Sequence, residues 1–331
     1  MPVGERSHPL ISIVIPVYNG ANYLSNAVET ALNQTYSPIE VVVVNDGSTD
    51  GGKTKAVAES YASRIRYIEK ANGGVATALN EGIRAMRGEY FVWLSHDDVL
   101  HADYVRLQVA NIEHRKVQAG ICNVGVIDAN SDRQPGFGDY WKTLGPLSDR
   151  PYLFHREWIY ACSIMVKRSF FDSYGMFDEE LRSCQDIEYT YRVLYFESCC
   201  FERKVLCFRR DHDDNGIKSS DVQKSHADEL GRMYDGLIRR FGIWFFFAKV
   251  DRPLGSVAKA WTLLRFAALF DNHYVGSRFR QAAAGTRVPG LMMWVFHQTS
   301  RAYLRSGAIL AGLRHRGRRA TSRLRQITAK A

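Results

Sequence analysis

Apolar and polar positions alternate along the first hundred residues in a pattern that predicts repeated strand–helix units. Short runs rich in β-branched residues predict strands, and longer segments with apolar residues at helical spacing predict helices. The expected strands are 10–17, 39–44, 65–69 and 89–94, and the expected helices are 21–34, 51–63 and 74–86. Strands that alternate with helices form parallel sheets with right-handed crossovers. The pattern therefore predicts an α/β fold with a mostly parallel central sheet.

The later part of the chain changes character near residue 220. Before it, the pattern predicts a helix at 101–115, strands at 118–127, 159–166 and 199–208, and a helix at 185–196. Residues 128–150 are polar, contain Gly and Pro, and predict a long loop. Beyond 220 the pattern becomes helical and basic. We therefore expect a catalytic domain at residues 1–220 and a helical, basic C-terminal region at residues 221–331.

The strand expected at 89–94 is followed by two adjacent carboxylates, Asp97 and Asp98. Neighbouring carboxylates repel each other and are costly to desolvate, and a divalent cation removes both problems. Open α/β sheets also bind ligands at the carboxyl ends of their strands. A metal-assisted site for an anionic ligand is one interpretation, and capping of the helix expected at 101–115 is the other. Polar residues after the other parallel strands favour the site.

Composition narrows the class of protein. The chain has 331 residues, 46% apolar and 24% charged, as in globular proteins. No apolar run approaches the roughly 20 residues of a membrane span, and the N-terminus lacks the pattern of a signal peptide. The six cysteines show no CxxC spacing, so we expect reduced thiols and a cytoplasmic location.

The net charge of +9 is concentrated near the C-terminus. Twelve of the 44 Lys and Arg residues follow Asp271, with no acidic residue after it, which leaves 32 basic against 35 acidic residues before. This region could bind an anionic membrane surface, bind nucleic acid, or pack as ordinary helices. No nucleic-acid module is visible, so no nucleic acid is expected. We expect packed helices, with residues 301–330 attracted to the cytoplasmic face of a membrane.

Several motifs follow one another in a fixed order between about Leu10 and Ser220. They are Ser12–Gly20 (SIVIPVYNG) with Asn33–Tyr36 (NQTY), Val41–Asp50 (VVVVNDGSTD), Asn72–Gly74, Ser95–Asp98 (SHDD), Gly175–Glu179 (GMFDE) and the pair Gln185-Asp186. Together they resemble the inverting family 2 glycosyltransferases of the GT-A fold, with SHDD at the position of the DxD motif. The resemblance implies transfer of one sugar from a nucleotide-diphosphate sugar to an acceptor hydroxyl.

The resemblance also implies roles for the acidic residues. Asp98 resembles the family's ligand for Mn²⁺ or Mg²⁺, and His212 resembles a histidine that completes the metal shell, although it could be a simple loop histidine. Asp97 resembles the residue that holds the ribose or the donor sugar. Asp186 resembles the general base, and its alternative is an exposed carboxylate at a helix N-terminus.

The base pocket follows from the same resemblance. Asp46 matches the carboxylate that accepts N3–H of a pyrimidine, a donor that uracil and thymine share, so the expected donor is a UDP-sugar or a dTDP-sugar. The remaining donor-binding residues are expected at the first and third motifs: Pro16, Val17, Tyr18, Asn19 and Gly74.

Three positions depart from the family pattern. Ser95 replaces the frequent first Asp of DxD, Leu79 stands where many members have Arg, and Gln185 replaces the Glu before the base. These departures keep open a catalytically degenerate relative that binds nucleotide-sugar, and a nucleotidyltransferase on a similar sheet is a second alternative. No QxxRW element follows, which favours addition of a single sugar. A glycan or lipid-linked acceptor of cell-envelope polysaccharide synthesis is expected.

Overall fold

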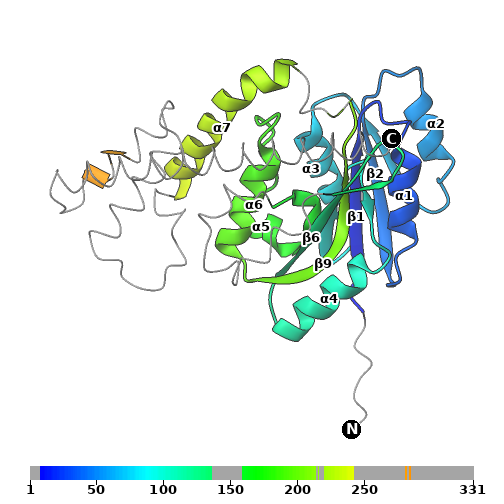
Figure 1. Cartoon of the computed structure of the whole chain (residues 1–331), viewed down its shortest axis with the longest axis horizontal. Coiled ribbons are helices and arrows are strands. Elements are labelled where there is room, and N and C mark those ends of the chain that lie inside the picture. The colour runs from blue at the N-terminus through cyan, green and yellow to red at the C-terminus, as the bar shows by residue number, and fades with distance from the viewer. Residues whose placement is uncertain are drawn as a thin grey trace, which may run out of the picture. The chain divides into compact units, whose positions relative to one another are not determined.

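Strands and helices alternate along the first hundred residues, as the hydrophobic pattern predicts (Figure 1). The computed structural model describes residues 8–135, 159–213, 215, 220–241, 280, 281, 283 and 284. Its first elements are β1 (Ile11–Val17), α1 (Leu24–Leu32), β2 (Ile39–Asp46), α2 (Lys53–Glu59), β3 (Arg66–Lys70), α3 (Val75–Ala85) and β4 (Tyr90–Trp93). Every residue of β1 and β4 is buried, as expected for central strands that are covered on both faces.

The second part of the fold adds shorter elements. They are β5 (Val99–Leu100), α4 (Tyr104–Arg115), β6 (Ala119–Ile127), β7 (Arg133–Gln134), a 3₁₀ turn (Ala161–Ser163), β8 (Ile164–Lys167), α5 (Ser169–Tyr174), α6 (Gln185–Phe196), β9 (Cys199–Arg210) and α7 (Ser220–Phe241). The hydrophobic pattern did not predict β5, α5 or β7, which lies in the loop expected at 128–150, because elements of two to six residues are too short to show a period. The strand expected at 159–166 starts later, after the 3₁₀ turn.

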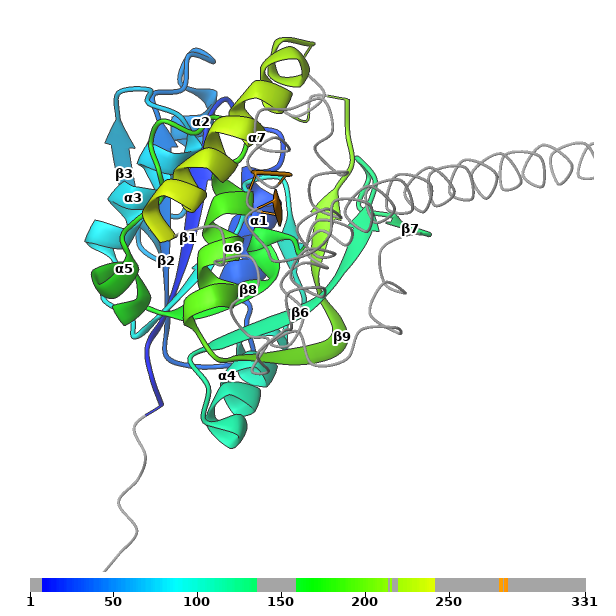
Figure 2. The same cartoon turned by 90° about the vertical axis from the view of Figure 1, so that its left-hand side faces the viewer.

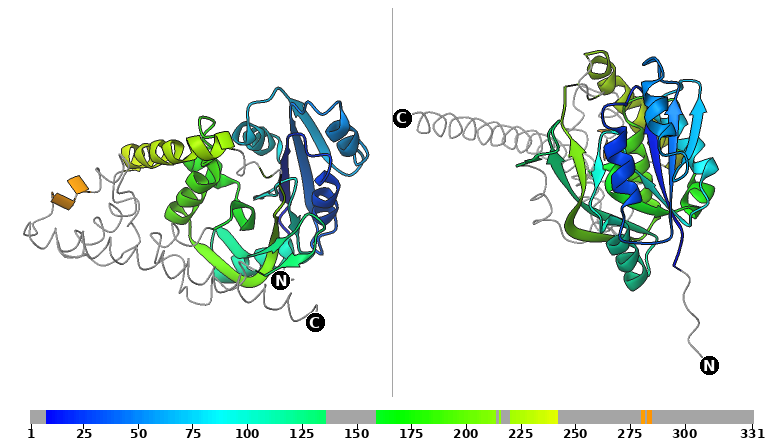
Figure 3. Two further views of the ribbon diagram at one scale, coloured as in Figure 1. Left: turned by 45° about the horizontal axis from the view of Figure 1, so that its top comes forward. Right: turned by 90° about the vertical axis from the view of Figure 1, so that its right-hand side faces the viewer.

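All nine described strands belong to one mixed sheet, in the order β3-β2-β1-β4-β8-β6-β9-β5, with β7 paired to β6. β1 pairs in parallel with both β2 and β4, and β8 runs antiparallel between β4 and β6. α1 and α2 cover one face of β1 and β2, and α3 covers the other (Figure 1). The sheet curls along β6 and β9 (Figure 3). The predicted α/β fold with a mostly parallel sheet is confirmed.

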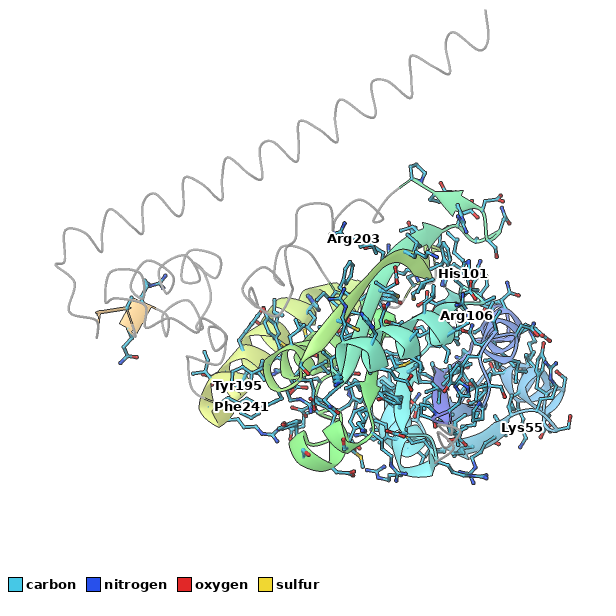
Figure 4. All side chains as sticks on the ribbon, turned by 90° about the horizontal axis from the view of Figure 1, so that it is seen from below. Lys55, His101, Arg106, Tyr195, Arg203 and Phe241 are labelled. Atoms are coloured by element: carbon cyan, nitrogen blue, oxygen red, sulfur yellow. The ribbon has the colours of Figure 1, made fainter. Side chains whose placement is uncertain are left out.

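The helix after the paired carboxylates begins later than expected. α4 starts at Tyr104, and β5 separates it from Asp98. His101, labelled in Figure 4, donates its backbone N–H to Leu206 O of β9 at 2.8 Å, so the chain is still part of the sheet there. Asp103 occupies the N-cap position of α4. Asp97 and Asp98 therefore do not cap this helix, and the capping interpretation is wrong.

An aromatic cluster holds α6 against the sheet. The ring of Phe177, from the GMFDE motif, lies 4.7 Å from that of Tyr189 on α6 and 5.7 Å from that of Trp93 at the end of β4. Asn80 of α3 exchanges two hydrogen bonds with the backbone of Phe177, at 2.9 and 3.0 Å. α5 and α6 lie on the same side of the sheet as α3 (Figure 2). This packing fixes the start of α6, where Asp186 lies.

The chain divides into two compact units. The first contains Met1–Met233 and Phe245–Lys249, and the second contains Tyr234–Trp244 and Val250–Ala331. α7 therefore begins in one unit and ends in the other, and the predicted boundary near residue 220 stays a prediction. Among the described helices none is long and apolar enough to cross a membrane. The basic segment 301–330, and the predicted loop beyond residue 135, lie outside the described residues.

Candidate functional site

The turns that follow three parallel strands are tied together at the carboxyl edge of the sheet. Asn19, just after β1, has a left-handed backbone (φ +49°), and its backbone N–H donates to Ser48 Oγ at 2.9 Å. Its side-chain oxygen accepts the N–H of Thr49 at 2.7 Å. Gly20 packs directly against the ring of His96, where a Cβ atom would collide. The first, second and fourth strands thus deliver their turns to one place.

Asp46, at the end of β2, organises the turn before α3. Its carboxylate accepts the backbone N–H groups of Gly73 and Gly74 at 3.0 and 2.7 Å, and it pairs with Lys70 Nζ at 2.7 Å. The side chain is nearly buried. A contact between Asp46 and a nucleobase stays a prediction, and these three partners already use most of the roughly four acceptor positions of the carboxylate.

Asp97 and His212 face each other across the site. Asp97 Oδ2 lies 3.1 Å from His212 Nε2 and accepts a hydrogen bond from Asn215 Nδ2 at 3.3 Å. The ring of Tyr23, from the turn after β1, lies 4.8 Å from the His212 ring. The side chains of Asp97 and His212 are 15% and 7% exposed. The structure therefore brings two predicted site residues together, from strand ends that are 115 residues apart in the chain.

Asp98 points into the protein instead. The residue is 1% exposed, and its two oxygens accept hydrogen bonds from Tyr160 Oη at 2.5 Å and from the backbone N–H of Arg210 at 2.9 Å. Burial, and then the negative charge of Asp97, raise the pKa of the Asp98 carboxyl well above its usual range. A metal-ligand role for Asp98 stays a prediction, but it conflicts with this geometry because both oxygens already have protein partners.

The side chain of Arg210 is buried and links several segments of the site through hydrogen bonds. Its Nε donates to the carbonyl of Asp97 at 2.7 Å, and its Nη1 donates to the carbonyls of Asp128 and Ala129 at 3.0 and 3.2 Å. Its guanidinium also lies 4.5 Å from the centre of the Tyr23 ring. Arg210 thereby fixes the loop that carries Asp97.

Asp186 occupies the first turn of α6. Its Oδ1 accepts the backbone N–H of Ile187 at 2.8 Å. Burial raises the pKa of Asp186 from its ordinary value of 3.8 to about 6, and the negative charge of Glu229 adds to the effect. A carboxyl with this pKa is ionised at neutral pH but holds a proton more strongly than a solvated Asp does, which suits a general base.

The segment before Asp186 touches the turn that Asp46 organises. Arg182 donates a hydrogen bond from Nη1 to the carbonyl of Gly73 and lies over Gly74, whose φ is +91°. Leu79, at the position where Arg was expected in α3, is fully buried. The loop before α6 therefore supplies a positive charge, that of Arg182, to the Gly73–Gly74 turn, where α3 supplies none at Leu79.

Comparisons with known proteins identify the family. Residues 12–175 match the model of glycosyl transferase family 2. An uncharacterized glycosyltransferase of Rickettsia typhi is 36% identical over 238 residues, which cover 70% of this chain and 72% of that protein. The chain belongs to glycosyltransferase family 2. This membership excludes the nucleotidyltransferase alternative.

Longer members of the glycosyltransferase family also match. An uncharacterized glycosyltransferase of Rickettsia bellii is 37% identical over 245 residues, covering 70% of this chain but 34% of that protein. The chondroitin synthase of Escherichia coli is 32% identical over 224 residues, covering 66% of this chain and 31% of the synthase. The chain thus spans about a third of the length of these relatives.

Solved glycosyltransferases share the fold. The structure of S. aureus TarS in complex with UDP-GlcNAc has a TM-score of 0.57, 16% identity, and coverage of 90% of this chain and 92% of that one. A mannosyltransferase from Pyrobaculum calidifontis, in complex with GDP-mannose and Mn²⁺, has a TM-score of 0.55, 19% identity, and coverage of 92% and 81%. These glycosyltransferases have the GT-A fold that the motifs predicted.

The remaining predicted site residues of this glycosyltransferase lie at the same edge. Pro16 and Val17 are buried at the end of β1, and Tyr18 is 45% exposed. Tyr160 was missed, because no local pattern marks a tyrosine whose hydroxyl reaches a carboxylate 62 residues away. Ser95, the departure in the DxD position, has its Oγ 3.4 Å from Cys162 Sγ.

Few of the described side chains at this edge are arranged to bind a divalent cation. Within the described residues, no cluster of three or more His, Cys, Asp or Glu side chains is found that could hold one. Asp97 and His212 nevertheless supply one carboxylate and one imidazole 3.1 Å apart, and both ligand types suit Mn²⁺. This partial set fits a cation that takes its other ligands from substrate phosphates and water, as Mg²⁺ and Mn²⁺ do in many transferases.

Proposed function

We propose that this glycosyltransferase moves one sugar from a UDP-sugar or dTDP-sugar to an acceptor hydroxyl, with inversion, and that Asp186 is its general base. The observation that carries the proposal is the position of Asp186. Its carboxyl is partly buried at the start of α6, its pKa is raised to about 6, and its loop is hydrogen-bonded to the Gly73–Gly74 turn.

The chemistry requires a proton acceptor on the side of the sugar opposite the nucleotide. Asp186 takes the proton of the acceptor hydroxyl as that oxygen attacks the anomeric carbon, and the bond to the diphosphate breaks on the other face. Inversion at the anomeric carbon follows from this single displacement. General base catalysis of this kind typically contributes about 10²–10⁴-fold to the rate.

The donor's nucleotide is proposed to bind at the joined turns of the sheet edge. Pro16, Val17, Tyr18 and Asn19 wall the base, and Gly74 approaches the ribose or the diphosphate. Asp46 is proposed to accept N3–H of the pyrimidine base, and it also holds Gly73 and Gly74, whose N–H groups its oxygens accept. Nucleotide sugars in the complexes of TarS and of the mannosyltransferase support a donor of this chemical class.

Asp97 and His212 are the proposed ligands for Mn²⁺ or Mg²⁺. Asp97 is preferred to Asp98, because Asp98 is committed to Tyr160 and to the backbone of Arg210. When bound, a divalent cation stabilises the negative charge that develops on the leaving diphosphate. The mannosyltransferase from Pyrobaculum calidifontis, which is in complex with Mn²⁺, supports this choice of cofactor. The Asp97 backbone is held by Arg210, so the carboxylate is positioned without a metal.

The acceptor is proposed to be a glycan or a lipid-linked glycan of polysaccharide synthesis. The relationship to a chondroitin synthase supports polysaccharide as the product class. A cytoplasmic location, with residues 301–330 attracted to anionic lipids, fits a lipid-linked acceptor. Cosedimentation with anionic and neutral vesicles tests the attraction, and equal binding to both rejects it.

Turnover of a panel of UDP-, dTDP- and GDP-sugars in the presence of Mn²⁺ tests the function. Wild type should consume one pyrimidine donor, and Asp186→Asn should lose transfer while it keeps UDP binding. The anomeric configuration of the product, read by NMR, reports inversion. A catalytically degenerate relative would bind UDP and turn over no donor, which would refute the proposal.

A further inference from the structure

A carboxylate from α7 closes the N-terminal end of α6. Glu229 is 2% exposed, and its Oε1 accepts the backbone N–H groups of Arg182, Ser183 and Cys184 at 2.7, 2.7 and 2.9 Å. N–H groups at the start of a helix have no partner within the helix. Cys184, at the N-cap position of α6, provides no side-chain cap of its own. Glu229, 45 positions away in the chain, instead accepts the N–H of this N-cap residue and of the two residues before it.

A second side chain on the same face of α7 reaches the same segment. His226 lies one helical turn before Glu229, and its Nδ1 is 3.0 Å from Ser183 Oγ and 3.6 Å from Cys184 Sγ. Residues three apart on a helix lie on one face. The first part of α7 therefore contacts residues 182–184 through two side chains, those of His226 and Glu229. This segment leads directly into Asp186, with Gln185 alone in between.

We propose that Glu229 is a positioning residue that holds Asp186 in place for proton transfer, an inference that rests on the proposed role of Asp186 as general base. One carboxylate oxygen that collects three N–H groups fixes the backbone direction at residues 182–184. The same segment carries Arg182, which is bound to Gly73. Glu229 thereby sets the distance between the general base and the donor's turn, and α7 becomes part of the catalytic scaffold.

The charge of Glu229 also affects the pKa of Asp186, which an uncharged packing contact would not do. On α6 itself, Glu188 is paired with Arg192 at 2.7 Å, and Arg192 is directed to the carbonyls at the end of α5. On the preceding loop, Arg182 is directed to Gly73. From α7, His226 and Glu229 contact the segment, and the positive charge of Arg232 also acts on Cys184. The negative charge of Glu229 contributes to the raised pKa of Asp186. Removing that charge should lower the pKa of Asp186.

Two substitutions separate position from charge. Glu229→Gln keeps an oxygen that can accept the three N–H groups but removes the charge, and Glu229→Ala removes both. Asp228→Asn is the matched control, because Asp228 is the neighbouring exposed carboxylate on α7. The readouts are kcat and KM against pH for the nucleotide sugar that wild type consumes fastest, UDP binding by calorimetry, and hydrogen exchange of residues 182–188.

We expect Glu229→Ala to lower kcat at least about tenfold, with donor KM and UDP binding little changed, since small misplacements of catalytic groups cost up to about 10²-fold. Glu229→Gln should recover much of this loss and should move the acid limb of the kcat profile to lower pH. Exchange at 182–188 should accelerate in the Ala variant and much less in the Gln variant. Asp228→Asn should change none of these.

The outcomes for Glu229 and for Asp186 are distinguishable. If Asp186→Asn abolishes transfer but both Glu229 variants keep the wild-type kcat and acid limb, the positioning role is wrong and the proposed function stands. If Asp186→Asn retains transfer, or if wild type consumes no donor, the proposed function fails and this inference fails with it. If Glu229→Ala does not fold, Glu229→Gln decides through its acid limb, and an unmoved limb overturns the proposal.

Discussion

Replacing Asp186 by Asn should make the protein more stable while it removes catalysis. The amide keeps an oxygen that can accept the N–H of Ile187, so the local hydrogen bond survives. What disappears is the ionisable carboxyl, which burial makes costly to ionise. Active sites often contain an ionisable residue with a perturbed pKa, even though burying its charge lowers the stability of the fold.

The size of the effect follows from the pKa. A carboxyl with a pKa of 3.8 when unfolded and about 6 when folded loses about 3 kcal/mol on folding once both states are ionised, at about 1.4 kcal/mol per pKa unit. The partial solvent access of the side chain makes this an upper value. The folded pKa already includes any favourable effect of the α6 N-terminus on the carboxylate, so no separate contribution is subtracted for it. With the discount for solvent access, the gain is about 2 kcal/mol.

The pH dependence has a definite sign. Between about pH 4 and pH 6 the folded chain keeps the proton that the unfolded chain has released, so this group makes wild-type stability fall as the pH rises. Asn does not ionise, so the gain of the variant should be small near pH 4 and complete above about pH 6. In wild type, kcat should fall as the pH drops below about 6, because the base must be ionised.

Thermal melting of wild type and Asp186→Asn at several pH values measures the gain, which we expect to be roughly 4–8 °C at pH 7.5. Asp172→Asn is the control, because Asp172 is an exposed carboxylate in the first turn of α5. It should show only the small loss of the helix-terminal charge. A gain for Asp186→Asn that is equal at pH 4 and pH 7.5, or no gain at all, would refute the reasoning.

Three further predictions concern the metal, the core and the donor turn. Asp97→Asn should weaken the Mn²⁺-dependent part of UDP binding at least about tenfold in calorimetry, and unchanged binding would remove Asp97 as a ligand. Arg192→Met should destabilise the protein by about 3–5 kcal/mol in denaturant unfolding, because it leaves the buried Glu188 without its cation; a loss below 1 kcal/mol would contradict this. Gly74→Ala should reduce turnover more than Gly51→Ala. Both glycines have positive φ, but only a Cβ at Gly74 would meet a side chain, the guanidinium of Arg182, and displace its hydrogen bond to Gly73; equal turnover in the two variants would show that this hydrogen bond does not matter.

The sequence predicts the elements of this fold wherever they are long enough to show a period. α6 begins at Gln185 and ends at Phe196, the bounds that the pattern predicts. The short β5 and α5 escape prediction, and β5 is the element that separates Asp98 from α4. A two-residue strand owes its existence to pairing with β9, which is distant in sequence. The local sequence pattern therefore cannot predict this strand.

The partners of the acidic residues show the same division. Motifs in the sequence single out Asp46, Asp97, Asp98 and Asp186, because each of these acids lies in a motif that resembles one of the family. The motifs do not reveal which of these carboxylates stays accessible to solvent and ligands. That choice is made by Tyr160 and Arg210, which occupy both oxygens of Asp98 and leave Asp97 to His212.

By itself, the sequence determined the α/β fold, the family and the set of acidic residues, since periodicity and motif order are local properties of the chain. The tertiary structure decided the burial and the hydrogen-bond partners of each acid, because these depend on segments that meet only after folding. Asp186 acquires its raised pKa from burial, and Glu229 reaches the start of α6 from a helix whose sequence pattern indicates a helix but not its partner.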